Sequence, residues 1–332
     1  MSHQVTLKTV PVVTVLRNAP CGASGPKEKR NMNGFLNVNK PTGRTSSDVV
    51  VFVRKRLPRG TAVGHGGTLD PEACGVLPVC VGSATRLFDY IIDKRKTYVA
   101  RIKLGVETDT QDATGRVVAE RPVNAGEAEL RAVLPRFVGD IQQVPPMYSA
   151  LKRDGKRLYQ LARKGETLAL APRACRVDGI EYLGRESDDV YRLKIDCGKG
   201  VYIRTLCHDI GRALGCGAHM QTLERVAAGI FRVEDALTPE AIDALAAEGR
   251  LEDALLPLDA PLEHLPAVHV DSRARHAVLN GNPLKPAWLD APAPRVPAVR
   301  VYLDGQFAGI GEPREDGCVR FRAMLYRVED GI

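Results

Sequence analysis

Apolar and polar residues alternate along several segments of the chain, which predicts β-strands with one buried and one exposed face. The alternation is clean over residues 98–104 and 192–197, and a shorter alternating run at 33–41 ends at a proline. The two clean segments are typical of antiparallel strands. A nearly continuous apolar run at 76–81 instead predicts a strand that is buried on both faces.

Helical spacing is present in three other segments. Turn and capping residues at 42–48 precede apolar positions that predict a helix ending at about Leu57. A short helix is expected at 84–92, and another should run through Leu206 and end at Gly215. Strands and helices therefore mix without regular βαβ alternation, which predicts an α+β fold with a mixed, mainly antiparallel sheet flanked by helices.

Changes in composition divide the chain into three parts. We expect residues 1–32 to be a basic, disordered extension, 33–262 to form one large domain, and 266–332 to form a small C-terminal β-barrel. Asp-Gly at 304–305 lies between two alternating runs, which is the signature of a tight hairpin. Within the large domain, residues 142–176 carry eight Lys or Arg against two acids and form a basic insertion.

The overall composition narrows the class of protein. The 44% hydrophobic and 26% charged content is ordinary for a globular protein, and the net charge of +7 favours a polyanionic partner. The eight cysteines include no C-x-x-C pair, so we expect free thiols and a cytoplasmic location. We expect no membrane span, because no apolar run reaches roughly 18 residues. The sequence also signals no metal site and no cofactor.

The strongest candidate for chemistry is the glycine-rich loop at 64–71, Gly-His-Gly-Gly-Thr-Leu-Asp-Pro. Its glycines allow close approach of another molecule, and Pro71 biases Asp70 toward an extended conformation. Asp70 is therefore a carboxylate held in a defined direction. The simpler alternative is a hairpin turn with a capping aspartate.

This loop, together with Gly75-Val76-Leu77-Pro78, resembles motif II of the TruB family of pseudouridine synthases. Further segments resemble other family motifs in the same order, and the tail resembles a PUA domain, which is an RNA-binding barrel. These segments are Lys40–Ser46, Lys96–Ala100, Leu104–Gly115, Pro145–Gly165 and Gly200–Leu206.

The resemblance implies a tRNA pseudouridine synthase of bacterial type. Such an enzyme isomerises a uridine, here uridine 55 of the T-arm stem-loop, after flipping the base out of its stack. It needs no cofactor and no obligatory protein partner, and we expect a monomer. The resemblance also identifies residues 33–262 as the catalytic domain and 266–332 as the PUA-like domain.

The resemblance implies a role for individual residues of the site. Asp70 would be the essential carboxylate, and Arg204 would keep it ionised. Tyr98 would be the platform on which the flipped base stacks, with Tyr202 and Leu223 lining the pocket. On local pattern alone, Arg204 could instead be a surface ion pair, Tyr98 a core residue and Leu223 ordinary helix packing.

Other family positions would contact the RNA more widely. His65 would take the place vacated by the flipped nucleotide, and Lys40 would support the pocket or contact phosphate. The basic insertion would hold the RNA backbone, which positions the substrate without reading its sequence. Its candidate contacts are Lys152, Lys156, Arg157 and Arg163.

The chain departs from the family pattern beside the carboxylate. Gly66 and Cys74 stand where the family has Thr and Thr or Ser, and an inward-pointing Glu72 would raise the pKa of Asp70. Three alternative functions stay open: a tRNA-folding chaperone that needs no catalysis, a passive RNA-binding scaffold and a guide-RNA-dependent synthase.

Overall fold

The computed structural model describes residues 32–92, 95–149, 152–153, 156–158, 168 and 170–326. Contacts divide the chain into two units, Met1–Arg30 and Asn31–Ile332, and every described residue belongs to the second. The predicted disordered extension therefore lies almost entirely outside the described residues. Within these ranges, no helix is both long and apolar enough to cross a membrane.

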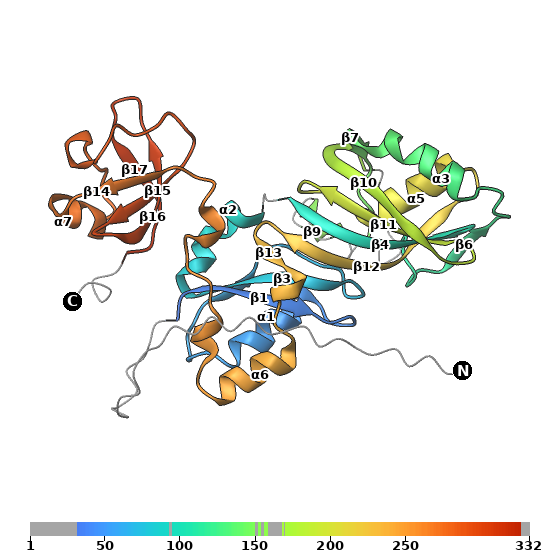
Figure 1. Ribbon diagram of the computed structural model, residues 1–332, viewed down its shortest axis with the longest axis horizontal. Helices are drawn as coiled ribbons and strands as arrows, with labels where there is room; N and C mark the ends of the chain where they lie inside the picture. The colour runs from blue at the N-terminus through green and yellow to red at the C-terminus, as the bar shows by residue number, and fades with distance from the viewer. Residues whose placement is uncertain are drawn as a thin grey trace, which may run out of the picture. The chain divides into compact units, whose positions relative to one another are not determined.

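The main sheet has nine strands and is mainly antiparallel, which confirms the predicted fold class (Figure 1). Its order is β1-β3-β12-β4-β11-β10-β7, with β2 paired to β3 and β13 paired to β12. The strands are β1 (Gly34–Lys40), β2 (Val63–His65), β3 (Cys74–Val81), β4 (Lys96–Leu104), β7 (Gly139–Gln143), β10 (Arg173–Ser187), β11 (Val190–Cys197), β12 (Ala218–Ala228) and β13 (Phe231–Arg232).

One junction in this sheet differs from the rest. Strands β3 and β12 are parallel and pair only where Glu224 and Arg225 lie opposite Cys74 and Gly75. On one side of the junction β1 and β3 pair antiparallel, and on the other side β12, β4 and β11 do the same. The sheet therefore consists of two halves that diverge from a short contact.

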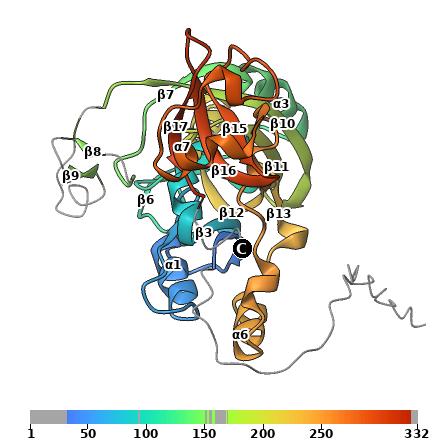
Figure 2. The ribbon, with the colours of Figure 1, turned by 90° about the vertical axis from the view of Figure 1, so that its left-hand side faces the viewer.

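Helices pack on both halves of the sheet. The helices are α1 (Ser46–Arg54), α2 (Phe88–Ile92), α3 (Glu127–Val133), α5 (Ile203–Ala213), α6 (Pro239–Ala247) and α7 (Arg275–Leu279). Helices α1 and α6 lie on the same side of β1 and β3 (Figures 1 and 2), where Val53 and Ile242 share one apolar core with Leu36 and Leu77. Helix α5 contributes Ile203, Leu206 and Ile210 to the core of the other half.

Local sequence explains where these elements begin and end. Thr45 and Asp48 form a capping box at the start of α1, which ends at Arg54, three residues before the predicted end. Residues 82–87 form a 3₁₀ helix, η1 (Gly82–Leu87), so that only the last part of the helix expected at 84–92 is α-helical. In β4, burial alternates at every position from end to end, as predicted.

Three smaller sheets complete the described fold. Strands β5 (Val106–Thr108) and β6 (Val117–Glu120) form a hairpin, and so do the two-residue strands β8 (Lys152–Arg153) and β9 (Lys156–Arg157). The C-terminal sheet has the order β14-β15-β16-β17. Its strands are β14 (Ala267–Val270), β15 (Val299–Leu303), β16 (Gln306–Pro313) and β17 (Val319–Met324).

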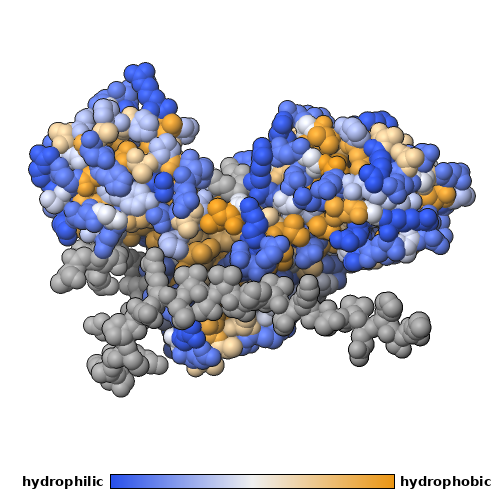
Figure 3. Space-filling model, in the orientation of Figure 1, coloured by the Kyte–Doolittle hydropathy of each residue, from blue (hydrophilic) through white to orange (hydrophobic). Residues whose placement is uncertain are grey.

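Two further predictions from the sequence are confirmed. Asp304 and Gly305 both have positive φ, 50° and 79°, and join β15 to β16 through the expected tight turn. All seven cysteines in the described part of the chain are free. The face shown in Figure 3 is mostly hydrophilic, with hydrophobic patches scattered over it.

Candidate active site

The two halves of the main sheet diverge beside a cavity of about 440 Å³ that contains Asp70. The loop that follows β2 brings Asp70 to this cavity, and β12 brings Leu223. Its lining residues are Thr42, Asp70, Glu72, Ala73, Cys74, Val99, Arg101, Asp112, Ala113, Thr114, Arg192, Met220, Gln221, Thr222, Leu223 and Glu224.

The loop that carries Asp70 is fixed on both sides of the carboxylate. The Leu69 amide donates to Ser46 Oγ at 2.9 Å, and the same hydroxyl donates to the Leu69 carbonyl at 3.2 Å. The Gly43 amide donates to the Pro71 carbonyl at 2.9 Å. Gly67 has a φ of 120°, which an L side chain rarely adopts, so the loop needs glycine there.

Lys40 supports the loop from inside the protein. Its side chain is fully buried, and Nζ donates to the carbonyls of Pro41, Arg44 and Pro71 at 2.9, 2.5 and 2.9 Å. Burial lowers the pKa of Lys40 from 10.5 to about 8. All three ammonium protons are therefore engaged by backbone carbonyls, a geometry that fits the predicted supporting role rather than contact with phosphate.

Arg204 lies at the start of α5 and joins two carboxylates. Its Nη2 is 2.7 Å from Asp70 Oδ2, and its Nη1 is 3.4 Å from Asp112 Oδ2. The arginine is only 5% exposed, so it is not the surface ion pair that the local pattern also allowed. Arg204 Nε is buried and has no hydrogen-bond partner among the described residues.

Opposing effects set the protonation of Asp70. Burial raises the pKa of Asp70, the Arg204 guanidinium lowers it, and the neighbouring Asp112 raises it again. Glu72 is exposed, and the acid that raises the pKa of Asp70 is Asp112 rather than Glu72. The Asp70 side chain keeps 35% exposure, so it can reach a bound molecule.

Asp112 is the site residue that our sequence analysis did not single out. Its Oδ1 accepts hydrogen bonds from the Thr110 hydroxyl and from the amide and hydroxyl of Thr114, at 2.7, 3.0 and 2.6 Å. Thr205 on α5 donates to Gln111 in the same loop at 2.7 Å. Asp112 could have been found from the sequence, because it is an acid within a Thr-rich turn and that turn belongs to a segment that resembles a family motif.

The predicted pocket residues Tyr98 and Leu223 lie in one apolar cluster with Leu69 and Ala73. Tyr98 is 8% exposed on β4. Leu223 lines the Asp70 cavity from a strand, so the helix packing considered for it is wrong. Leu223 therefore lines the Asp70 cavity, whereas Tyr98 belongs to the buried cluster and is not one of the lining residues.

Tyr202 is the N-cap residue of α5, two positions before Arg204. The Gln143 side-chain amide donates to the Tyr202 carbonyl at 3.0 Å and accepts from the Tyr202 amide at 2.9 Å. Burial raises the pKa of the Tyr202 phenol. Gln143 on β7 therefore fixes the backbone that positions Arg204.

His65 lines a different hollow. This hollow of about 520 Å³ also includes Arg54 and Val51 of α1, while the lining of the Asp70 cavity does not include His65. His65 Nδ1 is buried with no partner among the described residues, and burial lowers the pKa of the imidazole.

The predicted backbone contacts belong to the basic insertion. Lys152 lies opposite Arg157 in the β8–β9 hairpin, and Lys156 is in the same hairpin. Arg163 lies outside the described residues. These four positions therefore stay a prediction.

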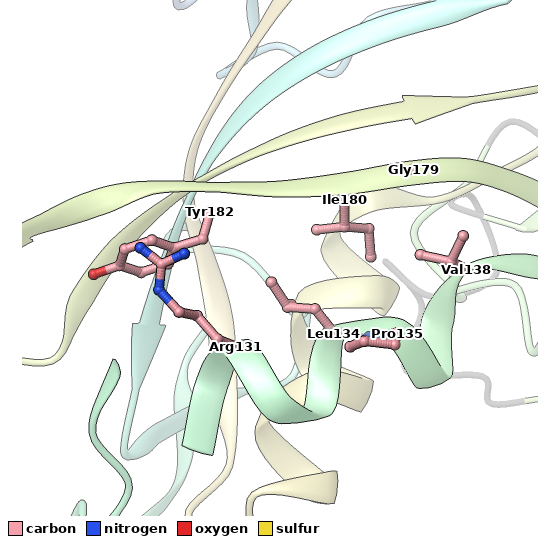
Figure 4. A pocket seen from close by; sticks show the side chains of 7 residues that line it. All are labelled: Arg131, Leu134, Pro135, Val138, Gly179, Ile180 and Tyr182. Carbon is pink, nitrogen blue, oxygen red and sulfur yellow. The ribbon is translucent and has the colours of Figure 1, made fainter. Parts of the chain in front are cut away.

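A second hollow, of about 490 Å³, lies between α3, the following 3₁₀ turn η2 (Leu134–Phe137) and β10 (Figure 4). Its one charged lining residue is Arg131, which stacks over the Tyr182 ring at 4.0 Å and pairs with Glu127 at 2.7 Å. This cation is therefore already partnered. The lining of this hollow contains no carboxylate, in contrast to that of the Asp70 cavity.

The chemistry of the Asp70 cavity follows from its charges. An ionised carboxylate can act as a base or a nucleophile, and the guanidinium beside Asp70 favours that charged form against burial, which raises the pKa of Asp70. Within the described ranges, no group of three side chains is placed to hold a metal ion.

Three family models match the chain in succession. The "TruB family pseudouridylate synthase (N terminal domain)" matches residues 55–203, and the "tRNA pseudouridylate synthase B C-terminal domain" matches 204–263. "Pseudouridine synthase II TruB, C-terminal" matches 266–324. The chain belongs to the TruB family.

Curated TruB relatives cover nearly the whole chain. The "tRNA pseudouridine synthase B" of Pseudomonas fluorescens strain Pf0-1 is 44% identical over 302 residues, which are 90% of this chain and 97% of the relative. The protein of the same name from Dehalococcoides mccartyi is 44% identical over 288 residues, 86% and 94% of the two chains.

Two solved structures similar to this TruB chain come from multicomponent complexes. A chain from an H/ACA RNP bound to a substrate RNA containing 2′-deoxyuridine has a TM-score of 0.68 at 26% identity, covering 90% of this chain and 86% of that one. A chain from a Cbf5-Nop10-Gar1 complex has a TM-score of 0.65 at 30% identity, covering 85% and 78%.

Proposed function

We propose that this protein isomerises a uridine of tRNA, uridine 55 of the T arm by family resemblance, to pseudouridine. The observation that carries the proposal is the contact of Arg204 with Asp70, a carboxylate that lines a cavity large enough for a nucleobase. The relatives named tRNA pseudouridine synthase B, which align over most of the chain, identify tRNA as the substrate.

Asp70 supplies the ionised carboxylate that the reaction needs. The N1–C1′ bond of the flipped uridine breaks, the base turns, and a new C5–C1′ bond forms. The hydrogen on C5 is then lost to water and N1 regains a proton, so no group is exchanged with a second substrate. Arg204 holds Asp70 in its charged form through both stages, because its guanidinium lies 2.7 Å from the carboxylate.

The flipped base needs a surface that replaces the stacking it loses. Unstacking costs about a few kcal/mol, and stacking on an aromatic ring returns about 1–3 kcal/mol per base. Tyr98 provides the ring, while Leu223 and Tyr202 complete the pocket. Lys152, Lys156, Arg157 and Arg163 neutralise backbone phosphates, so that affinity for RNA falls steeply with added salt.

The protein acts on tRNA directly, as a cytoplasmic monomer without a guide RNA or an obligatory protein partner. Its identity to the curated tRNA enzyme of Pseudomonas fluorescens, 44%, exceeds its identity to the chains from the H/ACA RNP and the Cbf5-Nop10-Gar1 complex, 26% and 30%. Residues 33–262 form the catalytic domain, and 266–332 form a PUA-like domain that adds RNA-binding surface.

Release of tritium from tRNA labelled at uridine C5 tests the proposal, because forming the C5–C1′ bond expels that hydrogen. We expect the wild type to release one tritium per tRNA, and mapping should place the pseudouridine in the T arm. Tight tRNA binding without release would support a chaperone or a scaffold instead. Release that depends on added guide RNA would support the guide-dependent alternative.

A further inference from the structure

Arg225 on β12 is a buried cation for which the reaction described above has no role. It is 0% exposed and is the largest of the fully buried side chains in the described part of the chain. Nε donates to the Val76 carbonyl at 2.7 Å, and Nη2 donates to the Gly67 carbonyl at 3.2 Å. In the described part of the chain, no carboxylate forms an ion pair with it.

A buried guanidinium without a carboxylate partner is energetically unfavourable in a protein core. Removing a charge from water costs several kcal/mol, and carbonyl dipoles compensate less than an opposite charge would. A Leu or Met would fill the same space at a lower desolvation cost. The contacts of Arg225 therefore indicate that it fixes the positions of neighbouring groups and does not serve stability alone.

Arg225 lies at the junction of the two halves of the sheet. It pairs with Gly75 of β3 on one side and with Tyr98 of β4 on the other. A Cβ on Gly75 would lie 2.4 Å from the Arg225 carbonyl oxygen, so the two backbones meet as closely as glycine allows. One residue thus contacts the strand after the Asp70 loop and the strand that carries Tyr98.

Arg225 also lies beside the two features that would meet a flipped base. Gly67, whose carbonyl accepts from its guanidinium, lies three residues before Asp70. Tyr98 lies directly opposite Arg225 on the antiparallel strand β4, so the two side chains lie on the same face of the sheet. Burial raises the pKa of the Tyr98 phenol and the charge of Arg225 opposes that rise, which agrees with a close contact.

We propose that Arg225 is a positioning residue that fixes the Tyr98 ring relative to the glycine-rich loop, so that the flipped base meets a preformed stacking platform. This inference rests on the proposed function for the role of Tyr98 and assigns a second task to the fold. Arg204 affects the ionisation of Asp70, whereas Arg225 affects the position of the flipped base.

A double-mutant cycle tests the inference with two RNAs. Wild type, Arg225→Met, Tyr98→Phe and the double variant are titrated with a T-arm stem-loop that has either uridine or an abasic site at the target position. We expect Arg225→Met to weaken binding of the uridine RNA about tenfold, equivalent to about 1.4 kcal/mol of lost stacking. Binding of the abasic RNA should change less than about twofold, since no base is there to stack.

The remaining variants separate positioning from simple structural support. Tyr98→Phe removes the hydroxyl but keeps the ring, and adding it to Arg225→Met should weaken binding no further. Arg225→Lys keeps the charge and should recover part of the base-dependent affinity. If thermal unfolding shows that Arg225→Met is unfolded, Arg225→Lys takes its place in the titrations.

Equal weakening for both RNAs, or additive effects of the two substitutions, would overturn the inference and leave Arg225 as structural support. Failure of the proposed function is recognised separately, because the wild type would then release no tritium from tRNA.

Discussion

Buried cations support the Asp70 loop from two sides and are held in different ways. On the side of α5, which we call the α5 wall, the Arg204 guanidinium contacts two carboxylates, Asp70 and Asp112. On the side of β3, which we call the β3 wall, Lys40 and Arg225 both pair with Gly75 and donate to backbone carbonyls. All three cations are buried, yet one wall places charge against charge and the other places charge against backbone.

The difference separates two tasks of an active site. A cation beside carboxylates changes their protonation, because it favours the charged form. A cation among carbonyls fixes the path of the chain, because several backbone groups converge on one side chain. Variants of the α5 wall should therefore alter rate and pH dependence, and variants of the β3 wall should alter stability and the placement of the base.

Arg204→Met should produce the largest effect on the α5 wall. Loss of a preorganised charge partner lowers the single-turnover rate of tritium release by about 10²–10³-fold, as for other preorganised electrostatic groups. Without the guanidinium the pKa of Asp70 rises further, so the acidic limb of the pH–rate profile moves to higher pH. An unchanged acidic limb would show that Arg204 does not control the charge of Asp70.

Lys40→Met should produce the largest loss of stability on the β3 wall. It leaves three buried carbonyls without their donor, and we expect the free energy of unfolding to fall by about 3 kcal/mol. Urea unfolding near neutral pH measures this difference. An unchanged free energy of unfolding would show that the three contacts do not hold the loop.

The pH dependence of the free energy of unfolding of wild type and Lys40→Met gives a second measurement. The pKa of Lys40 is about 8 in the fold and 10.5 in the unfolded chain, so between these values the unfolded state binds more protons. The wild type should therefore gain stability relative to Lys40→Met as the pH rises from 8 to 10.5. A constant difference across this window would contradict the burial of the charged amine.

Asp112→Asn should have a moderate effect on the α5 wall. Hydrogen bonds to charged groups contribute about 1.5–3 kcal/mol, so the single-turnover rate should fall by about 10- to 100-fold. The substitution also removes a negative charge that raises the pKa of Asp70, so the acidic limb moves to lower pH. Glu72→Gln is the matched control, and it should leave the limb in place because Glu72 is not among the charged groups that shift the pKa of Asp70.

Gly66→Thr, which restores the usual residue of the family motif, should have the smallest effect. Its Cβ would lie 2.7 Å from Ile91 Cδ1, the end of a flexible side chain, and 3.3 Å from Pro78 Cβ. We expect a loss of about 1 kcal/mol in the free energy of unfolding, at the low end for overpacking. Adding Ile91→Val should restore stability. A larger loss of stability that Ile91→Val does not relieve would show that the backbone, rather than the Ile91 side chain, disfavours threonine at position 66.

Much of the fold could be predicted from the sequence, because it follows from local patterns. The alternation in β4, the capping box at Thr45 and the Asp304-Gly305 turn each depend on residues close together in the chain. Asp70 could be predicted for the same reason, since its loop is a continuous motif.

The rest of the site depends on contacts between distant segments. Arg204 and Asp112 are 92 residues apart, and no local pattern shows that α5 places one beside the other. The burial of Arg225 was equally hidden, because arginine is a surface residue by default. Segment 218–228, which contains Leu223, has no clean alternation, since the register of β12 shifts between Met220 and Thr222 and again between Arg225 and Ala227.

The most direct test of the account compares wild type, Asp70→Asn and Glu72→Gln in tritium release from tRNA labelled at uridine C5, with tRNA affinity measured in parallel. We expect release by the wild type and Glu72→Gln and none by Asp70→Asn, which should still bind tRNA. Release by Asp70→Asn at the rate of the wild type would contradict the assignment of Asp70 as the essential carboxylate.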